Sequence, residues 1–174
     1  MLVIMAGLPG TGKTTIASEL ARLLGGTRID KDNVRAALFS PPEIEYSDEQ
    51  DDLCIDTMLS AADFLFRKRP DHLVILDGRT FTRRYQREHV VSVAESRGWP
   101  WVIIECVCSD ETARRRLEQP AQPHPAANRD YSLYQRLKKN WESSEFPRTI
   151  VDTDAPLSEC IDRAFDAIRE FKSR

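Results

Sequence analysis

The sequence predicts an α/β fold built on a doubly wound, parallel sheet of five strands. Three observations lead to this prediction. Continuous apolar runs such as Leu2–Ala6 and Trp101–Val107 are typical of strands buried on both faces of a parallel sheet. Segments with apolar residues at helical spacing alternate with these runs along the chain. A glycine-rich turn at residues 7–12 joins the first run to the first helical segment, as in a strand–turn–helix unit.

Helix start and stop signals place the elements of the first part of the chain. Gly25–Gly26 ends the first helix, Pro41–Pro42 breaks a short second one, and Ser47 with Gln50 forms a capping-box pattern before a long third. The expected elements are a strand at 2–6, a helix at 13–24, a strand at 27–30, a helix at about 32–38, a long helix that ends near residues 69–70, and a strand at 72–76.

The second part of the chain continues the alternation. Ser109 is the expected cap of a short helix, and prolines 120, 123 and 125 mark an irregular loop at 120–128. We expect a helix at 85–96, a strand at 101–107, helices at 110–118 and 131–141, a strand at 149–151 and a helix at 157–171. The length favours a single domain over residues 1–174, with a short lid at about 114–130.

Composition excludes several classes of protein. The chain has 174 residues with 25 basic and 28 acidic side chains, which argues against broad, non-specific binding of nucleic acid but allows a small basic groove. Its apolar runs fall far short of the ~20 residues that a membrane span needs. The apolar start without a basic leader predicts a cytoplasmic protein, and the four scattered cysteines predict buried free thiols. The oligomeric state stays open.

The glycine-rich turn carries the clearest functional signal. The run Gly7-Leu8-Pro9-Gly10-Thr11-Gly12-Lys13-Thr14 satisfies the P-loop pattern G-x-x-x-x-G-K-[ST]. Its backbone amides and the following helix N-terminus favour phosphate binding. The sequence therefore predicts a P-loop NTPase that binds ATP and Mg²⁺, with Lys13 on the β- and γ-phosphates and the Thr14 hydroxyl on the metal. The expected phosphate-binding residues are Gly7, Leu8, Pro9, Gly10, Thr11, Gly12, Lys13, Thr14 and Thr15.

Other features narrow the class of P-loop protein. A guanine-specific N-K-x-D motif is absent, and Gly78 follows Asp77 where mechanical ATPases commonly carry a glutamate. Asp77 itself ends a predicted strand, as a metal-associated carboxylate does. Several arginines follow the strands, and Arg79 is the one that we expect in an anion pocket. These features favour a kinase that moves the γ-phosphoryl of ATP to a hydroxyl acceptor.

The segment after the second strand predicts the acceptor side. Asp32 and Arg35 stand three residues apart in Lys31-Asp32-Asn33-Val34-Arg35, so they share one face at the start of a helix. Asp32 is suited to accept the proton of an attacking hydroxyl, and Arg35 to hold an anionic group. The alternative interpretation is a helix cap with a surface ion pair, which contributes only ~0–1 kcal/mol. Their place after a strand of a P-loop fold favours the functional interpretation.

With these two motifs the chain resembles the P-loop kinases related to polynucleotide 5′-hydroxyl kinases, zeta toxins and chloramphenicol phosphotransferase. The resemblance is strongest over residues 1–38. It implies a nucleoside-kinase-like fold with Asp32 as the general base, Arg35 on the acceptor phosphate or the transferred phosphoryl group, and Asp77 as the carboxylate after the third strand. It also implies that Arg116 is a lid arginine on the phosphates, with Arg129 as a second such residue.

Two questions stay open at this point. The acceptor is either the 5′-hydroxyl end of a nucleic acid or a small molecule, since the segment 39–52 carries no recognisable signature. A different class of function is an ATP-binding switch or slow ATPase that acts through a protein partner. The switch predicts that Asp32 is dispensable, whereas the kinase requires it.

Overall fold

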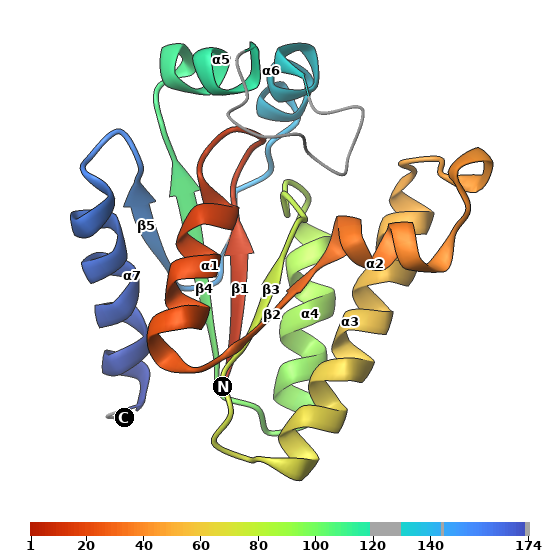
Figure 1. Ribbon diagram of the computed structural model, residues 1–174, viewed down its shortest axis with the longest axis vertical. Helices are drawn as coiled ribbons and strands as arrows, with labels where there is room; N and C mark the ends of the chain where they lie inside the picture. The colour runs from red at the N-terminus through yellow and green to blue at the C-terminus, as the bar shows by residue number, and fades with distance from the viewer. Residues whose placement is uncertain (119–129, 144, 173–174) are drawn as a thin grey trace.

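The computed structural model describes residues 1–118, 130–143 and 145–172. Its strands form one five-stranded sheet with the order β2-β3-β1-β4-β5, and every neighbouring pair is parallel (Figure 1). The strands are β1 (Leu2–Ala6), β2 (Thr27–Asp30), β3 (Val74–Asp77), β4 (Trp101–Val107) and β5 (Arg148–Asp152). This arrangement confirms the predicted doubly wound, parallel α/β fold.

Helices cover both faces of the sheet. On one face lie α1 (Lys13–Leu24) and α7 (Leu157–Lys172), and on the other lie α3 (Asp48–Lys68) and α4 (Arg84–Ser96). The remaining helices are α2 (Lys31–Leu38), the 3₁₀ turn η1 (Pro41–Glu43), α5 (Asp110–Glu118) and α6 (Tyr131–Lys139). In Figure 1, α5 and α6 lie beyond the carboxyl ends of β1 and β4, where the loops of this fold gather.

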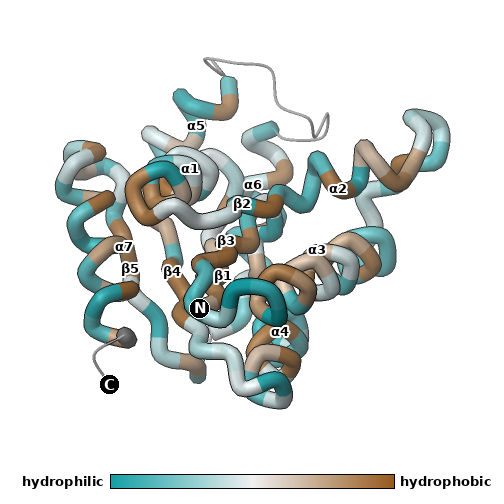
Figure 2. The backbone as a smooth tube through the Cα atoms, turned by 60° about the horizontal axis from the view of Figure 1, so that its bottom comes forward, coloured by the Kyte–Doolittle hydropathy of each residue, from teal (hydrophilic) through white to brown (hydrophobic). Residues whose placement is uncertain are grey.

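Strand β1 explains why the sheet needs a helical layer on each side. Its side chains alternate: Val3 and Met5 pack toward α1 and α7, whereas Leu2 and Ile4 pack toward α3 and α4, and all four are 0% exposed. Full burial of each such side chain contributes about 1.5–3 kcal/mol. The hydrophobic colouring of β1 and β4 in Figure 2 follows from this two-sided burial. A continuous apolar run was thus a correct sign of a central parallel strand.

Some element ends differ from the prediction for local reasons. The third strand begins at Val74 instead of residue 72, because His72 lies in a turn and donates its N–H to the carbonyl of Arg69 at 3.0 Å. Ser47 caps α3 by accepting the N–H of Gln50 at 3.2 Å. The reciprocal half of the predicted capping box is not formed, because the Gln50 amide group bonds the preceding loop at Glu43 and Glu45.

The helices over the sheet's carboxyl end form a small layer of their own. Ala113 and Leu117 of α5 pack against Tyr134 of α6, whose hydroxyl donates to Asp110 at 2.6 Å. Burial and the neighbouring Asp110 raise the pKa of that hydroxyl. Helix α6 ends at residue 139, two residues before the predicted end. Most of the predicted lid, with the loop 120–128 and Arg129, lies outside the described residues.

Two further expectations concern the whole chain. All four cysteines are free thiols, as predicted; Cys54, Cys106 and Cys160 are buried, whereas Cys108 is partly exposed. Among the residues that the structure describes, no helix is both long and apolar enough to span a bilayer.

Candidate active site

The P-loop joins β1 to α1 and has the backbone that its glycines predict. Gly7, Gly10 and Gly12 have φ angles of 132°, 80° and 82°, which favour glycine strongly. A Cβ atom on Gly7 would also lie 2.3 Å from the carbonyl oxygen of Cys106. Gly12 is the N-cap of α1, and no side chain caps this helix. The N-terminus of α1 therefore suits an anion.

Lys13 lies inside the curl of this loop. Its Nζ atom donates to the carbonyl oxygens of Gly7 and Leu8, each at 2.8 Å, and the residue is 8% exposed. Thr14 follows on the first turn of α1 and lines a pocket together with Lys13. Thr15, the next residue, lines a second pocket on the other side of the loop. The loop thus separates two cavities, each of which borders its backbone.

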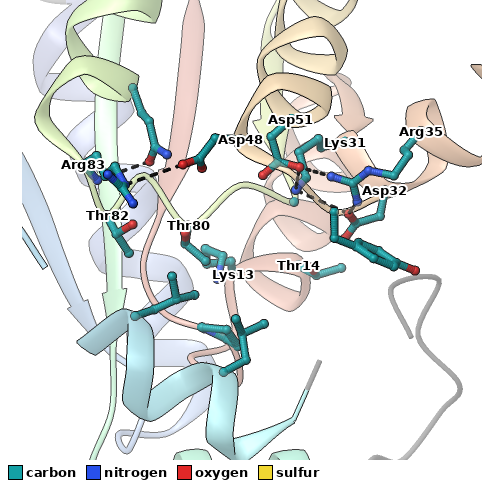
Figure 3. A pocket seen from close by; sticks show the side chains of 16 residues that line it. Lys13, Thr14, Lys31, Asp32, Arg35, Asp48, Asp51, Thr80, Thr82 and Arg83 are labelled. Carbon is teal, nitrogen blue, oxygen red and sulfur yellow. Dashed lines mark hydrogen bonds and ion pairs between the residues drawn. The ribbon is translucent and has the colours of Figure 1, made fainter. Parts of the chain in front are cut away.

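A network of ion pairs stands opposite the P-loop. Arg35 donates from Nη1 to Asp32 Oδ1 at 2.8 Å and from Nη2 to Asp51 Oδ1. Lys31 Nζ lies 2.7 Å from the same Asp51 oxygen and 3.6 Å from Asp32 Oδ1. Figure 3 shows these four side chains gathered between α2 and the first turn of α3. Two basic and two acidic groups therefore hold one another in a largely buried position.

This network and the P-loop face the same pocket, which has a volume of about 180 Å³. The pocket is enclosed by the P-loop, α2, the α2–α3 loop, the first turn of α3, the loop after β3, and α6. Such a cavity is smaller than the ~300–1,000 Å³ of drug-sized ligand pockets. Its lining includes Lys13, Thr14, Lys31, Asp32, Arg35, Tyr46, Asp48, Asp51, Thr80, Thr82 and Arg83.

Burial changes the titration of one member of the network. The pKa of Lys31 falls from 10.5 to about 8, mainly because burial disfavours the charged ammonium group, while Arg35 and Arg79 lower it further. The carboxylate of Asp32 opposes this shift. Lys31 is therefore the side chain here whose charge changes within a pH range accessible to experiment.

The loop after β3 forms another wall and is tied to the P-loop. The N–H of Gly7 donates to the carbonyl of Thr80 at 3.1 Å. The next residue, Phe81, is buried with a φ of 56°, a strained value for a non-glycine residue. Arg87 of α4 holds this conformation, since it donates to the Phe81 carbonyl and, at 2.7 Å, to the Glu142 carbonyl. These hydrogen bonds of Arg87 thus fix the loop after β3 in place.

Asp77 and Arg79 lie behind that wall instead of in the pocket. Asp77 Oδ2 accepts a hydrogen bond from Arg28 at 2.7 Å, and its Oδ1 is buried without a partner. Arg79 is 2% exposed and pairs with Asp52 at 2.6 Å. Arg83, four residues further on, lines the pocket instead. The predicted substrate contacts of Asp77 and Arg79 are not among the pocket-lining contacts, and their roles stay predictions.

Arg116 lies at the second pocket, on the other side of the P-loop. It donates to the carbonyl and the hydroxyl of Thr153, at 2.8 and 2.9 Å, and to the Gly10 carbonyl at 3.2 Å. This pocket is lined by the P-loop, the start of α1 and the β5–α7 loop. Its guanidinium joins the P-loop to the β5–α7 loop. The role of Arg116 on the phosphates, which the resemblance implies, stays a prediction.

The sequence analysis therefore located much of the pocket and missed part of it. Lys13, Thr14, Asp32 and Arg35 lie together as the two motifs predicted. Asp51 was missed, although three acidic residues in the first turn of α3 were visible, because acids at a helix start are ordinarily read as favourable to the helix dipole. Tyr46, whose ring lies 4.9 Å from the Arg35 guanidinium, had no local signal at all.

Comparison with known proteins defines the class. The chain matches the AAA domain family over residues 2–131 and belongs to it. With a gluconokinase from Sinorhizobium meliloti 1021 it shares 18% identity and a TM-score of 0.69, covering 97% of this chain and 91% of that chain. Its fold is the P-loop kinase-like α/β fold.

Two structures with bound nucleotides share the fold. An APS kinase, CysC, from Mycobacterium tuberculosis in complex with AMPPNP and APS gives 18% identity and a TM-score of 0.71, covering 97% of this chain and 96% of that chain. Kti12 from Chaetomium thermophilum in complex with ADP-AlF3 gives 21% identity and a TM-score of 0.62, covering 97% and 99%. The closer resemblance to polynucleotide kinases, zeta toxins and chloramphenicol phosphotransferase stays a prediction.

Proposed function

We propose that this protein is an ATP-dependent phosphotransferase that moves the γ-phosphoryl group to a hydroxyl acceptor. One observation carries the proposal: a single pocket has Lys13 and Thr14 of the P-loop on one side and Asp32 and Arg35 on the other. A phosphoryl donor and a proton acceptor would thus face each other across a small cavity. That arrangement suits phosphoryl transfer, in which positioning and charge stabilisation supply most of the catalysis.

The residues present fit a nucleoside triphosphate with Mg²⁺. The uncapped first turn of α1 and the Lys13 ammonium group suit the phosphates. The second pocket, between the P-loop and the β5–α7 loop, borders the phosphate loop and would take the base. The Thr14 hydroxyl, which lines the pocket, would hold the metal, whereas Asp77 does not line this pocket and pairs with Arg28. Bound Mg²⁺ would neutralise charge on the phosphates.

The transfer itself would follow from the positions of the protein groups. The oxygen of the acceptor hydroxyl attacks the γ-phosphorus, and its proton passes to the carboxylate of Asp32. The bond from the γ-phosphorus to the bridging oxygen breaks, so that ADP leaves and a phosphate monoester remains. Lys13 stabilises the charge that develops on the transferred group. Arg35 and Lys31 hold the carboxylate of Asp32 in place through ion pairs.

The first test is transfer of labelled γ-phosphate from ATP by the whole protein. The acceptors are a 5′-hydroxyl oligonucleotide and, in parallel, a small-metabolite mixture. We expect Asp32→Asn to lower transfer by about 10²–10⁴-fold, the usual contribution of a general base, and to leave ATP affinity unchanged. Asp56→Asn is the matched control, since Asp56 pairs with His89 on the protein surface and does not line the pocket.

Two results would contradict the proposal. Transfer that survives in Asp32→Asn would remove this residue from the role of base. A wild-type protein that binds ATP and labels no acceptor would favour the alternative function, an ATP-binding switch or slow ATPase that acts through a protein partner.

A further inference from the structure

The acceptor side of the pocket is already balanced in charge. Arg35 is 2% exposed, and its two terminal nitrogens are bonded to Asp32 and Asp51. Its remaining nitrogen, Nε, is sealed from solvent. Lys31 is paired with the same two carboxylates. Arg35 and Lys31 are thus each paired with both carboxylates, so the charges of the network cancel and an acceptor meets no excess positive charge there.

The same network leaves hydrogen-bond acceptors open to the pocket. Asp32 and Asp51 use Oδ1 for both cations, and among the described residues nothing donates to Oδ2 of either carboxylate. Both carboxylates belong to residues that line the pocket. Asp32 is only 7% exposed, yet it lines the cavity. Ionised carboxylates accept hydrogen bonds and donate none.

The paired cations and the carboxylate oxygens without a donor together favour an acceptor that donates hydrogen bonds. A phosphate or carboxylate on the acceptor would meet two open carboxylate oxygens and no unpaired cation of the network. Hydroxyl groups would donate to those oxygens without breaking an ion pair, and such charge-assisted bonds are strong. Arg83 also lines the pocket, but its side chain is 51% exposed and lies 3.7 Å from Asp48.

We propose that the acceptor is an uncharged polyol and that Asp51 binds the hydroxyl group next to the one that is phosphorylated. The two carboxylates share Lys31 Nζ, at 3.6 and 2.7 Å, so they lie side by side as neighbouring hydroxyls would require. Asp32 Oδ2 takes the proton of the attacking hydroxyl, and Asp51 Oδ2 accepts the hydrogen bond of its neighbour. The inference rests on the proposed phosphotransferase function, and the cavity of about 180 Å³ suits a metabolite.

The test compares acceptors that share a carbon skeleton and differ in charge. The wild-type protein is assayed with hexitols, inositols and aldoses, with the aldonate and phosphorylated forms of each, and with a 5′-hydroxyl oligonucleotide. We expect the neutral member to be preferred in each set, for example glucitol over gluconate. Monodeoxy forms of the best polyol should include one that loses about ten- to hundredfold in kcat/KM, the effect of one hydrogen bond to a charged group.

Asp51→Asn then tests the assigned residue. This variant should lose about ten- to hundredfold in kcat/KM for the polyol and discriminate much less against the sensitive monodeoxy form. Its ratio of gluconate to glucitol activity should rise, because removal of one negative charge leaves Lys31 and Arg35 less compensated. A merely structural role of Asp51 would not change these ratios. Asp63→Asn is the control: Asp63 is also on α3 and also paired with two cations, Arg67 and Arg97, but lies outside the pocket.

The possible outcomes separate the two proposals. Preference for the oligonucleotide or for anionic acceptors, or unchanged ratios in Asp51→Asn, would overturn the polyol assignment and leave the phosphotransferase intact. ATP binding without transfer to any acceptor in the panel or in the metabolite mixture would overturn both.

Discussion

The two sides of the candidate active site are built in different ways. The phosphate side consists of backbone: three glycines with positive φ, the uncapped amides of α1, and one lysine held by two carbonyl oxygens. The acceptor side consists of side chains from α2 and α3, held by ion pairs that cross between the two helices. A local motif is sufficient to specify the first kind of surface, whereas tertiary contacts specify the second.

This difference has a consequence for robustness. Backbone amides keep their positions as long as the loop keeps its dihedral angles, so many side-chain changes leave the phosphate side intact. On the acceptor side, removal of one partner leaves a buried charge uncompensated, which typically costs several kcal/mol. Substitutions on the acceptor side should therefore affect both folding and specificity, and those on the nucleotide side mainly ATP binding.

The largest effect that we expect comes from replacing Gly78, whose backbone lies against Lys31 on the acceptor side. Gly78 has a φ of 94°, and a Cβ atom there would lie 2.9 Å from the backbone nitrogen of Lys31. We expect Gly78→Ala to lower the free energy of unfolding by about 2–4 kcal/mol and to reduce kcat/KM for the acceptor more than that for ATP. Urea denaturation and steady-state kinetics measure the two effects.

The matched control for that substitution is Gly25→Ala. Gly25 also has a positive φ, 63°, but a Cβ atom there would have nothing within 4 Å. We expect Gly25→Ala to lower the free energy of unfolding by only about 1 kcal/mol, the cost of a left-handed backbone conformation. Equal losses in the two variants would show that contact with Lys31 is not what requires glycine at position 78.

A second prediction is that the two sides of the site respond differently to pH. Because the pKa of Lys31 is lowered to about 8 by burial, its ammonium group is charged below that pH and neutral above it. The neutral amine no longer compensates Asp32 and Asp51, so kcat/KM for the acceptor should fall by about tenfold for each pH unit above the pKa. Lys31→Arg should move this fall to higher pH, since a guanidinium stays charged.

The measurement is a profile of kcat/KM for the acceptor and of ATP affinity between about pH 7 and 9.5, a range set by the ordinary and lowered lysine pKa values. The affinity for ATP should vary much less than the acceptor profile. A fall at the same pH in Lys31→Arg would assign the titration to another group.

The smallest expected effect is on the nucleotide side. Arg116→Ala removes the hydrogen bonds to Thr153 and Gly10, which we expect to raise KM for ATP by about three- to tenfold, the effect of a partly exposed hydrogen bond. The KM for the acceptor should stay within about twofold. Arg114→Ala is the control, because Arg114 pairs with Glu118 on the surface of the same helix. A larger change for the acceptor than for ATP would contradict the separation of the two sides.

The contrast between a surface built from backbone and one built from side chains also explains which features could be predicted from the sequence. The parallel sheet was predictable because each central strand is buried on both faces and therefore apolar throughout. The P-loop was predictable because glycine at fixed spacing is required by the backbone. Asp32 and Arg35 were predictable because they lie one helical turn apart, so that their proximity is local.

The missed features all depend on contacts between distant segments. Asp51 reaches Lys31 across 20 positions of sequence, and no periodicity encodes that pairing. Arg79 and Arg83 follow the same strand, and the local sequence does not show that Arg83 lines this pocket and Arg79 does not. The contacts of Arg116 with Thr153 depend on how the β5–α7 loop packs, while its role on the phosphates, which the resemblance implies, stays a prediction.

The hydrogen bond from the Gly7 amide to the Thr80 carbonyl has a geometric consequence. It joins the first residue of the P-loop to the loop after β3 that lines the same pocket, so two walls that follow the neighbouring strands β1 and β3 are tied to each other. For the proposed phosphoryl transfer, this tie would keep the donor and acceptor positions at a constant spacing.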